Sequence, residues 1–374
     1  MSVLRRWASK IDDWLDAMRS EKRRRSGQEK RVVPVAYRGF GANGTIWLRG
    51  SVIEEDTLEK PAIRGGLLED LSITLQRFMA DEIMNATVTV RYGGAETTCI
   101  TDSDGFFYAE FNAPIAEGWQ EATVTLEDFP GREQGVVSVP GEFLVPHAGA
   151  AFGIISDIDD TVIRTGISAP LKNIRTVVES DPEARVAFPG LAPLYQALER
   201  GGTDAAINPI FYVSSGSWKL YDLIVRFKAL NDIPRGPMFM DDWGLDETRW
   251  FKSSHGKHKT GTIDRIMATY PDLDFILIGD SGQHDAEIYT KAMQDHGDRI
   301  KAIWIRDVSD DTRDAEVQTV LQAGRDAGIS VRAETDLLEA ATDAAARGWI
   351  TADDLAAVRA QIDAVVSYSK LPLS

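Results

Sequence analysis

Short apolar runs alternate with longer amphipathic stretches in the second half of this chain. Each apolar run covers four residues between polar flanks, which is typical of a buried strand. The predicted strands are Gly153–Ser156, Ile210–Val213, Pro237–Met240, Phe275–Ile278 and Ala302–Ile305, and the predicted helices among them are Leu191–Arg200, Trp218–Leu230, Lys259–Tyr270 and Asp285–Asp295. Such alternation predicts an α/β domain over residues 149–310, with a parallel sheet and helices on both of its faces.

Residues 33–148 show a different pattern, in which strand-like runs are separated by turn residues. The runs are Thr45–Leu48, Ala86–Tyr92, Phe106–Phe111, Glu121–Leu126 and Gly135–Val139. Turn-forming pairs such as Asn43-Gly44, Gly93-Gly94 and Pro130-Gly131 lie between them. This spacing predicts a β-sandwich-like domain of about seven strands. One interruption, Leu67–Met84, is interpreted as helical.

The N-terminal residues 1–32 are interpreted as an amphipathic helix followed by a basic linker. Apolar residues recur at spacings of three and four and so share one helical face: Leu4, Trp7, Ile11, Trp14 and Met18. A basic run extends from Arg19 to Arg31. One interpretation is a helix lying on an anionic membrane. The other, favoured by aspartates on the polar face, is a helix packed against the protein itself or against a partner.

The C-terminal residues 311–374 are predicted to contain helices that pack on the α/β domain. The expected helices are Ala315–Ala327, Thr335–Arg347 and Ala352–Val366.

Composition narrows the possible functions. The 374 residues carry a net charge of −17, which argues against nucleic-acid binding because that function needs clustered positive charge. The single cysteine, Cys99, excludes an internal disulfide and a cysteine-based zinc site. No apolar run reaches the ~18 residues of a membrane span, and no signal-peptide segment is recognised. We therefore expect a cytoplasmic protein, with peripheral membrane contact as one interpretation of residues 1–32.

Three carboxylates follow the first predicted strand of the α/β domain. Asp157, Asp159 and Asp160 stand directly before Thr161. The carboxyl ends of strands in an open parallel sheet are where ligands bind. Buried carboxylates are costly unless they are paired or bound to a metal ion. These residues therefore form either a ligand site or, in the simpler interpretation, a solvated acidic turn.

Further polar residues follow the other predicted strands or begin the helices. Ser214 and Ser215 follow Ile210–Val213, although Ser215 could instead cap the next helix. Lys257 and Lys259 open a predicted helix, and Asp280 and Asp285 follow the fourth strand. If all of these residues meet at one edge of the sheet, they form a site.

These residue types suit the transfer of a phosphoryl group. A carboxylate such as Asp157 can attack phosphorus, and Asp159, two positions on, can protonate the leaving oxygen and later deprotonate water. Asp280 and Asp285 can complete an oxygen-rich Mg²⁺ site. Ser214 and a lysine ammonium can hold the remaining phosphate oxygens.

The sequence Asp157-Ile158-Asp159-Asp160-Thr161 resembles the signature of the haloacid dehalogenase-like (HAD-like) phosphatase superfamily. The resemblance implies a Rossmann-like parallel sheet, a nucleophile at Asp157 and an acid/base at Asp159. It also implies Mg²⁺ bound by Asp157, Asp159, Asp280 and Asp285. The phosphate would be held by Thr161, Ser214, Ser215 and a lysine, either Lys259 or its rival Lys257.

A longer set of motifs lies over residues 150–310. The motifs are Ser156-Asp157-Ile158-Asp159-Asp160-Thr161-Val162, Tyr212-Val213-Ser214-Ser215, Asp242-Trp243-Gly244 and Gly279-Asp280-Ser281-Gly282-Gln283-His284-Asp285. Together they resemble the App1 family, which includes Mg²⁺-dependent phosphatidate phosphatases. One departure is Asp241, where a basic residue would be expected.

The gaps between the motifs bear on access to the site. The flap at Val162–Leu171 has about ten residues and the loop before Lys257 about 16, so neither holds a full cap domain. We expect an open site that admits large or membrane-embedded substrates, with Arg164 at its rim.

The sequence thus favours a Mg²⁺-dependent phosphatidate phosphatase acting at a membrane surface. The alternatives are the same chemistry on a protein, nucleotide or sugar phosphate, and a membrane or scaffold adaptor without catalysis. The complete set of aspartates speaks against the adaptor.

Overall fold

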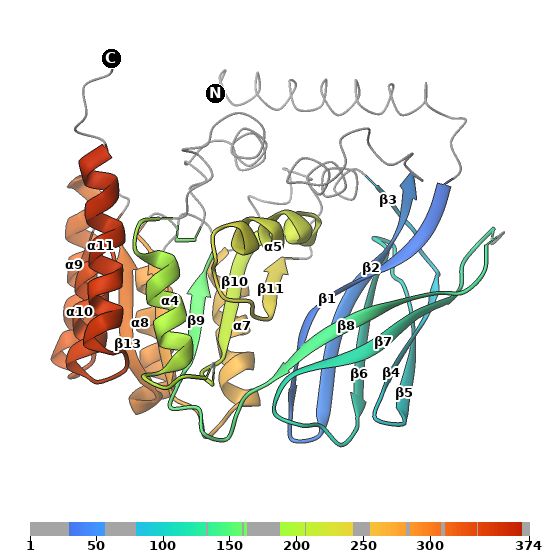
Figure 1. Ribbon diagram of the computed structural model, residues 1–374, viewed down its shortest axis with the longest axis horizontal. Helices are drawn as coiled ribbons and strands as arrows, with labels where there is room; N and C mark the ends of the chain where they lie inside the picture. The colour runs from blue at the N-terminus through green and yellow to red at the C-terminus, as the bar shows by residue number, and fades with distance from the viewer. Residues whose placement is uncertain are drawn as a thin grey trace, which may run out of the picture.

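The computed structural model describes residues 30–56, 80–131, 134–158, 161–162, 188–205, 207–241, 255–281, 285–307, 311–334 and 336–368. Two sheets lie side by side, and helices flank the one formed by the second half of the chain (Figure 1). No helix in these ranges is both long and apolar enough to cross a membrane.

The described part of the second half forms a six-stranded sheet in which every neighbouring pair is parallel. Its strands are β9 (Gly153–Asp157), β10 (Ile210–Ser217), β11 (Met238–Asp241), β12 (Phe275–Asp280), β13 (Ile300–Arg306) and β14 (Ser330–Glu334). Their order is β11-β10-β9-β12-β13-β14, so the chain starts in the middle and winds outward in both directions. The predicted parallel α/β sheet is confirmed, and its winding reverses between β9 and β12.

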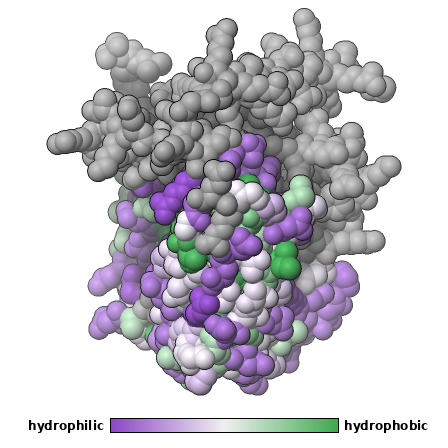
Figure 2. Space-filling view, turned by 90° about the vertical axis from the view of Figure 1, so that its right-hand side faces the viewer, coloured by the Kyte–Doolittle hydropathy of each residue, from purple (hydrophilic) through white to green (hydrophobic). Residues whose placement is uncertain are grey.

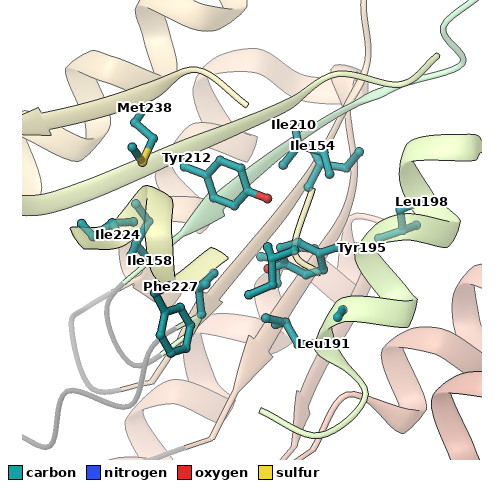
Figure 3. Close-up of a cluster of buried hydrophobic side chains, with 14 of the residues drawn as sticks. Ile154, Ile158, Leu191, Tyr195, Leu198, Ile210, Tyr212, Ile224, Phe227 and Met238 are labelled. Carbon is teal, nitrogen blue, oxygen red and sulfur yellow. The ribbon is translucent and has the colours of Figure 1, made fainter. Parts of the chain in front are cut away.

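Helices cover both faces of this sheet, and its strands are therefore buried on both sides. They are α4 (Leu191–Arg200), α5 (Tyr221–Leu230), α7 (His255–Thr269), α8 (Asp285–His296), α9 (Asp311–Asp326), α10 (Leu338–Ala346) and α11 (Ala352–Tyr368), with short 3₁₀ turns η2 (Trp218–Leu220) and η3 (Gly297–Arg299). Side chains of α4, α5, α10 and α11 share one core, part of which Figure 3 shows, and those of α7, α8 and α9 share the other.

Strand β14 corrects the expectation that only helices follow residue 310. This strand pairs with β13 and extends the parallel sheet by one strand. Its sequence, Ser-Val-Arg-Ala-Glu, has no apolar run that would have predicted it. The strand is tied to α10 instead by polar contacts, since Asp343 accepts hydrogen bonds from Ser330 Oγ and Arg332. The helices predicted there are present as α9, α10 and α11, whereas the proposed domain boundaries stay a prediction.

The described part of the first half forms one curled sheet of eight strands. They are β1 (Lys30–Ala42), β2 (Thr45–Asp56), β3 (Asp81–Glu82), β4 (Thr87–Tyr92), β5 (Ala95–Ile100), β6 (Phe106–Asn112), β7 (Gly118–Asp128) and β8 (Val137–Val145). The order is β3-β2-β1-β8-β7-β4-β5, and β6 pairs with β2 on the same edge as β3. Strands β5 and β6 lie next to each other, so the sheet curls around its own apolar core. Two separate sheets, as in a sandwich, are not confirmed.

Two predictions for the first half are wrong in part. Residues 30–32, expected in the basic linker, belong to β1, where Lys30 lies opposite Asp56 and Arg31 opposite Glu55. The opposite charges of Arg31 and Glu55 across the strand pair, followed by the β-branched pair at Val32 and Val33, favour a strand there. The segment Leu67–Met84 is predicted to be helical, but its residues Asp81–Glu82 form strand β3. Its residues 67–79 lie outside the described ranges.

The curled sheet packs against the edge of the parallel sheet through β1. The Phe40 ring lies 5.3 Å from the ring of Phe239 on β11, and Tyr270 at the end of α7 donates a hydrogen bond to the Gly41 carbonyl. The opposite, outer side of the curled sheet is mostly polar (Figure 2). The two sheets therefore share a core.

Candidate active site

The candidate site begins at the carboxyl ends of β9 and β12, the adjacent central strands. Asp157 is the last residue of β9 and Asp280 the last of β12, and both are fully buried. This edge, where the winding of the sheet reverses, is where open parallel sheets bind ligands. The two carboxylates thus lie where the sequence predicted a ligand site, and they are not part of a solvated turn.

A third buried carboxylate comes from the first residue of α8. Oxygen atoms of Asp157, Asp280 and Asp285 all lie within 4.8 Å of one another. Asp285 Oδ2 also accepts a hydrogen bond of 3.1 Å from the Asp280 backbone N–H. The close approach requires Gly279, because a Cβ there would stand 2.4 Å from Asp285 Oδ2. Glycine at the end of β12 therefore allows α8 to bring its carboxylate to the strand.

Lys259 on α7 supplies a buried cation to this cluster. Its Nζ lies 2.6 Å from Asp157 Oδ1 and 2.6 Å from Asp285 Oδ1. Burial by itself would lower the pKa of the ammonium, but the two carboxylates outweigh burial and raise that pKa. Lys259 is therefore protonated at neutral pH. Of the two rival lysines, the structure brings Lys259 to the carboxylates, while the side chain of Lys257 lies outside the described part.

Three hydroxyl residues complete the described portion of the site. Ser214 on β10 is fully buried and directly follows Val213, the partner of Asp157 across the strand pair. Ser214 Oγ accepts a hydrogen bond of 2.9 Å from the Gly216 N–H. Within the described residues the buried hydroxyls of Ser215 and Thr161 have no hydrogen-bond partner. Buried hydroxyls normally have one, so these two are available to the oxygen atoms of a ligand.

Several predicted site residues lie outside the described ranges. They are Asp159, Arg164 and most of the flap and loop thought to leave the site uncapped, and the neighbouring Asp160 lies outside them too. Asp241, the departure from the family pattern, is the last residue of β11.

The structure also adds residues that sequence reasoning missed. Ser156 Oγ hydrogen-bonds to the Asp157 carbonyl at 2.7 Å and lies 2.8 Å from the Tyr195 hydroxyl, which fixes the end of β9. Buried Arg306 ends β13 directly opposite Asp280, and its guanidinium lies 3.4 Å from the centre of the Phe188 ring. Its place just after a predicted strand was the available signal.

The arrangement suits a divalent metal ion in its donor chemistry. Asp157, Asp280 and Asp285 offer only carboxylate oxygens, the ligands that Mg²⁺ prefers. In the described part, the Lys259 ammonium contacts two of these three carboxylates, those of Asp157 and Asp285. The surplus of buried negative charge would be offset by a bound cation.

Comparison with known proteins is consistent with this geometry. Residues 152–307 match a family model described as the catalytic domain of phosphatidate phosphatase APP1. Phosphatidate phosphatase APP1 of Saccharomyces cerevisiae is 31% identical over 176 residues, which are 47% of this chain and 28% of that protein. An uncharacterized Schizosaccharomyces pombe protein is 23% identical over 159 residues, 42% of this chain and 25% of that protein. The matches therefore span about a quarter of each relative.

Similarity to solved structures is weak. A carbohydrate acetylesterase from Xanthomonas citri aligns with 12% identity and a TM-score of 0.26, over 78% of this chain and 75% of that one. A score this low carries no conclusion about fold. The sequence matches carry the comparison, and residues 152–307 of this chain are similar to the catalytic domain of the App1 family.

Proposed function

We propose that this protein is a Mg²⁺-dependent phosphatidate phosphatase of the HAD-like class, with a phosphorylated aspartate at Asp157 as its intermediate. The observation that carries the proposal is the cluster at the sheet edge, where the Lys259 ammonium lies between Asp157 and Asp285 with Asp280 beside them. A nucleophilic carboxylate needs nearby positive charge to approach an anionic phosphate, and this arrangement supplies it.

Asp157, Asp280 and Asp285 would hold the metal ion, with Asp159 added from the motif alone. A bound Mg²⁺ would neutralise charge that develops on the phosphate oxygens.

In the first step, an Asp157 oxygen forms a bond to phosphorus while the bond from phosphorus to the ester oxygen breaks. Asp159 donates its proton to the departing alkoxide, which leaves as the alcohol. In the second step, Asp159 takes a proton from water, the water oxygen bonds to phosphorus, and the bond to Asp157 breaks. Inorganic phosphate leaves and both carboxyl groups return to their starting states.

Lys259 and Ser214 would hold the non-reacting phosphate oxygens, with Thr161 and Ser215 as further donors. Lys259 is pre-placed against Asp157. The buried hydroxyls of Thr161, shortly after β9, and Ser215, near the end of β10, have no hydrogen-bond partner among the described residues. Donors fixed before the reaction need little rearrangement in the transition state.

Phosphatidate as the substrate rests on the family match and on the yeast relative. Phosphatidate lies in a membrane, so the enzyme would work at a membrane surface. The open rim inferred from the sequence agrees with that setting.

The test is phosphate release by the full chain from phosphatidate vesicles, glycerol phosphate, a nucleotide, a phosphopeptide and a synthetic aryl phosphate, with Mg²⁺ or with a chelator. We expect release from phosphatidate to exceed release from soluble esters and to require Mg²⁺. Asp157→Asn should lower release at least ~10³-fold, because an amide is a poor nucleophile, while circular dichroism shows an unchanged fold.

Each alternative has its own outcome in this test. Normal turnover by Asp157→Asn would sink the aspartyl-phosphate mechanism. Preference for a soluble ester would overturn the lipid substrate but keep the chemistry. Vesicle binding without release from any ester would favour the non-catalytic adaptor.

A further inference from the structure

An aromatic cluster joins the curled sheet to the segment that follows Ser214 and Ser215. The ring of Tyr37 on β1 stacks on the indole of Trp218 with centroids 4.8 Å apart and an interplanar angle of 12°. The same ring lies 4.4 Å from the ring of Tyr221. Trp218 and Tyr221 form η2 and the start of α5, only four to seven residues after Ser214. All three aromatic side chains are buried.

Arg49 on β2 contacts the same indole. Its guanidinium carbon lies 4.9 Å from the centre of the Trp218 ring and 4.7 Å from that of Phe106 on β6. A cation held over an aromatic face is attracted to it, more strongly when both are shielded from water. Trp218 is therefore held by two residues from different strands of the curled sheet.

Polar contacts hold the same segment at two more points, and a third fixes the ring that stacks on it. The Arg38 backbone N–H donates a 2.7 Å hydrogen bond to the Tyr221 hydroxyl, and the Lys219 ammonium pairs with the Glu82 carboxylate. The Tyr37 hydroxyl donates a 3.0 Å bond to Ser51 Oγ, which fixes the stacked ring within its own sheet. The position of residues 218–221 thus depends on strands β1, β2 and β3.

Backbone contacts connect this segment to the phosphate-binding hydroxyls. Ser217 Oγ accepts a hydrogen bond of 3.4 Å from the Lys219 N–H, and Ser217 itself pairs with Asp241 on β11. The Gly216 N–H donates to Ser214 Oγ. Strand β10 runs directly into η2 and α5, with a register shift against β11 between Val213 and Ser217, so a shift of Trp218 would act on the serines through this short segment.

We infer that Tyr37 and Arg49 of the curled sheet are positioning residues for the phosphate-binding hydroxyls of Ser214 and Ser215. The inference rests on the proposed function, because it assigns phosphate to those hydroxyls. It gives the curled sheet a role in the reaction beyond stability. The carboxylates and Lys259 belong to β9, β12, α7 and α8, so metal binding should depend much less on Tyr37 and Arg49.

The experiment uses the full chain and measures binding of inorganic phosphate, in the presence of Mg²⁺, and binding of Mg²⁺ alone, both by calorimetry. Tyr37→Leu removes the ring and should weaken phosphate binding about tenfold, the order expected when one aromatic pair is lost. Tyr37→Phe keeps the ring and should restore phosphate binding. Mg²⁺ affinity should stay within about twofold in both, since the carboxylates are untouched.

Arg49→Gln is the second variant, in case Tyr37→Leu does not fold, and should weaken phosphate binding in the same direction. Arg235→Met is the matched control. Arg235, in the segment before β11, reaches the curled sheet through Glu142 at 2.6 Å and through the Trp119 ring, and its contacts in the described part include none with residues 214–221. This control should bind phosphate as the wild type does.

Wild-type phosphate affinity in folded Tyr37→Leu and Arg49→Gln would overturn the inference alone. So would an equal loss in Arg235→Met, because the effect would then follow any weakening of contact between the sheets. A wild-type protein that binds no phosphate and hydrolyses no ester would overturn the proposed function together with the inference.

Discussion

Lys259 is the residue on which the charge balance of the candidate site depends. Its ammonium is buried and lies at 2.6 Å from two carboxylates. Removing one partner of a buried ion pair is costly because the remaining charge stays buried without compensation. Lys257, two residues earlier on the same helix, fits the family motif equally well in the sequence alone.

Comparing Lys259→Met with Lys257→Met therefore tests both the site and its assignment. Without metal, we expect the unfolding free energy of Lys259→Met to be about 3–5 kcal/mol lower than that of the wild type. We expect its rate of phosphate release to fall by ~10²–10³-fold. Added Mg²⁺ should recover part of the stability. Lys257→Met should change little. Urea unfolding with and without Mg²⁺, and phosphate-release assays, measure this, and the reverse ranking of the two variants would contradict the assignment.

Lys228 is a buried lysine outside the candidate site. Its Nζ lies 3.1 Å from the centre of the Tyr212 ring and has no hydrogen-bond partner among the described residues. Burial, helped by the positive charge of Arg38, lowers the pKa of this ammonium well below its ordinary value. The contact with the ring offsets part of the cost of burial but leaves the amine without an acceptor.

We expect Lys228→Met to be more stable than the wild type near pH 7, by about 1–3 kcal/mol. Between the lowered folded-state pKa and the unfolded value of about 10.4, the unfolded chain binds more protons. Wild-type stability therefore rises with pH in that window, and the advantage of the variant should narrow toward pH 10. Urea unfolding at a series of pH values measures this.

Lys291→Met, at an exposed lysine paired with Asp295, is the control and should show neither effect. A Lys228→Met protein that is less stable than the wild type at every pH would contradict the prediction.

At the scale of elements, the turn from β12 into α8 brings Asp280 and Asp285 together. A Cβ on Gly279 would meet the Asp285 side chain at 2.4 to 2.9 Å, so any larger residue displaces a proposed metal ligand.

Gly279→Ala should lower Mg²⁺ affinity and phosphate release by roughly 10-fold or more, the effect of displacing a group that must be precisely placed. Overpacking should also cost about 1–3 kcal/mol of stability. The control is Gly261→Ala on α7, where a Cβ meets nothing within 4 Å. An alanine there should stabilise the helix by up to about 1 kcal/mol. Calorimetric Mg²⁺ titration and thermal unfolding distinguish Gly279→Ala from Gly261→Ala. Equal Mg²⁺ affinities of these two variants would refute the steric argument.

Elements with strong local patterns were predictable, and those without were not. Helix α4 coincides with the predicted Leu191–Arg200, since its apolar residues repeat at helical spacing. Strand β1 contains Pro34 and begins within the basic run, and neither feature is typical of a strand. In the structure Pro34 nevertheless lies opposite Val52. Strand β5 alternates half-buried and exposed residues with little apolar content. Its place in the sheet comes from pairing with β4.

At the scale of the whole molecule, the role of residues 1–32 stays a prediction, because residues 1–29 lie outside the described part. Residues 30–32 start β1, so a clean deletion should end at residue 29.

If the segment contacts an anionic membrane, deleting residues 1–29 should weaken binding to anionic vesicles at least about tenfold at low salt, since each basic residue near the surface contributes ~1 kcal/mol. The difference should shrink at high salt. Hydrolysis of a soluble ester should be unchanged. A full-length variant with Lys22, Arg23, Arg24 and Arg25 changed to Gln serves as the control for charge, and vesicle co-sedimentation is the measurement. Unchanged vesicle binding would instead favour a helix packed on the protein.

The sequence by itself determined which residues stand at strand ends. Apolar runs bounded by polar residues mark strands locally, so Asp157, Ser214 and Asp280 were predictable as members of one sheet edge. The motif strings pointed to the App1 family for the same reason, because they need only neighbouring residues.

Only the tertiary structure decided which of these residues meet and what holds them. The contact of Lys259 with Asp157 joins residues about 100 positions apart, and the stacking of Tyr37 on Trp218 joins residues about 180 positions apart. The order of the strands likewise depends on pairings between distant segments. Such contacts depend on packing and pairing over the whole chain, and no local pattern encodes them. For that reason the curled sheet looked unrelated to catalysis in the sequence, while in the structure it supports the segment that carries Ser214.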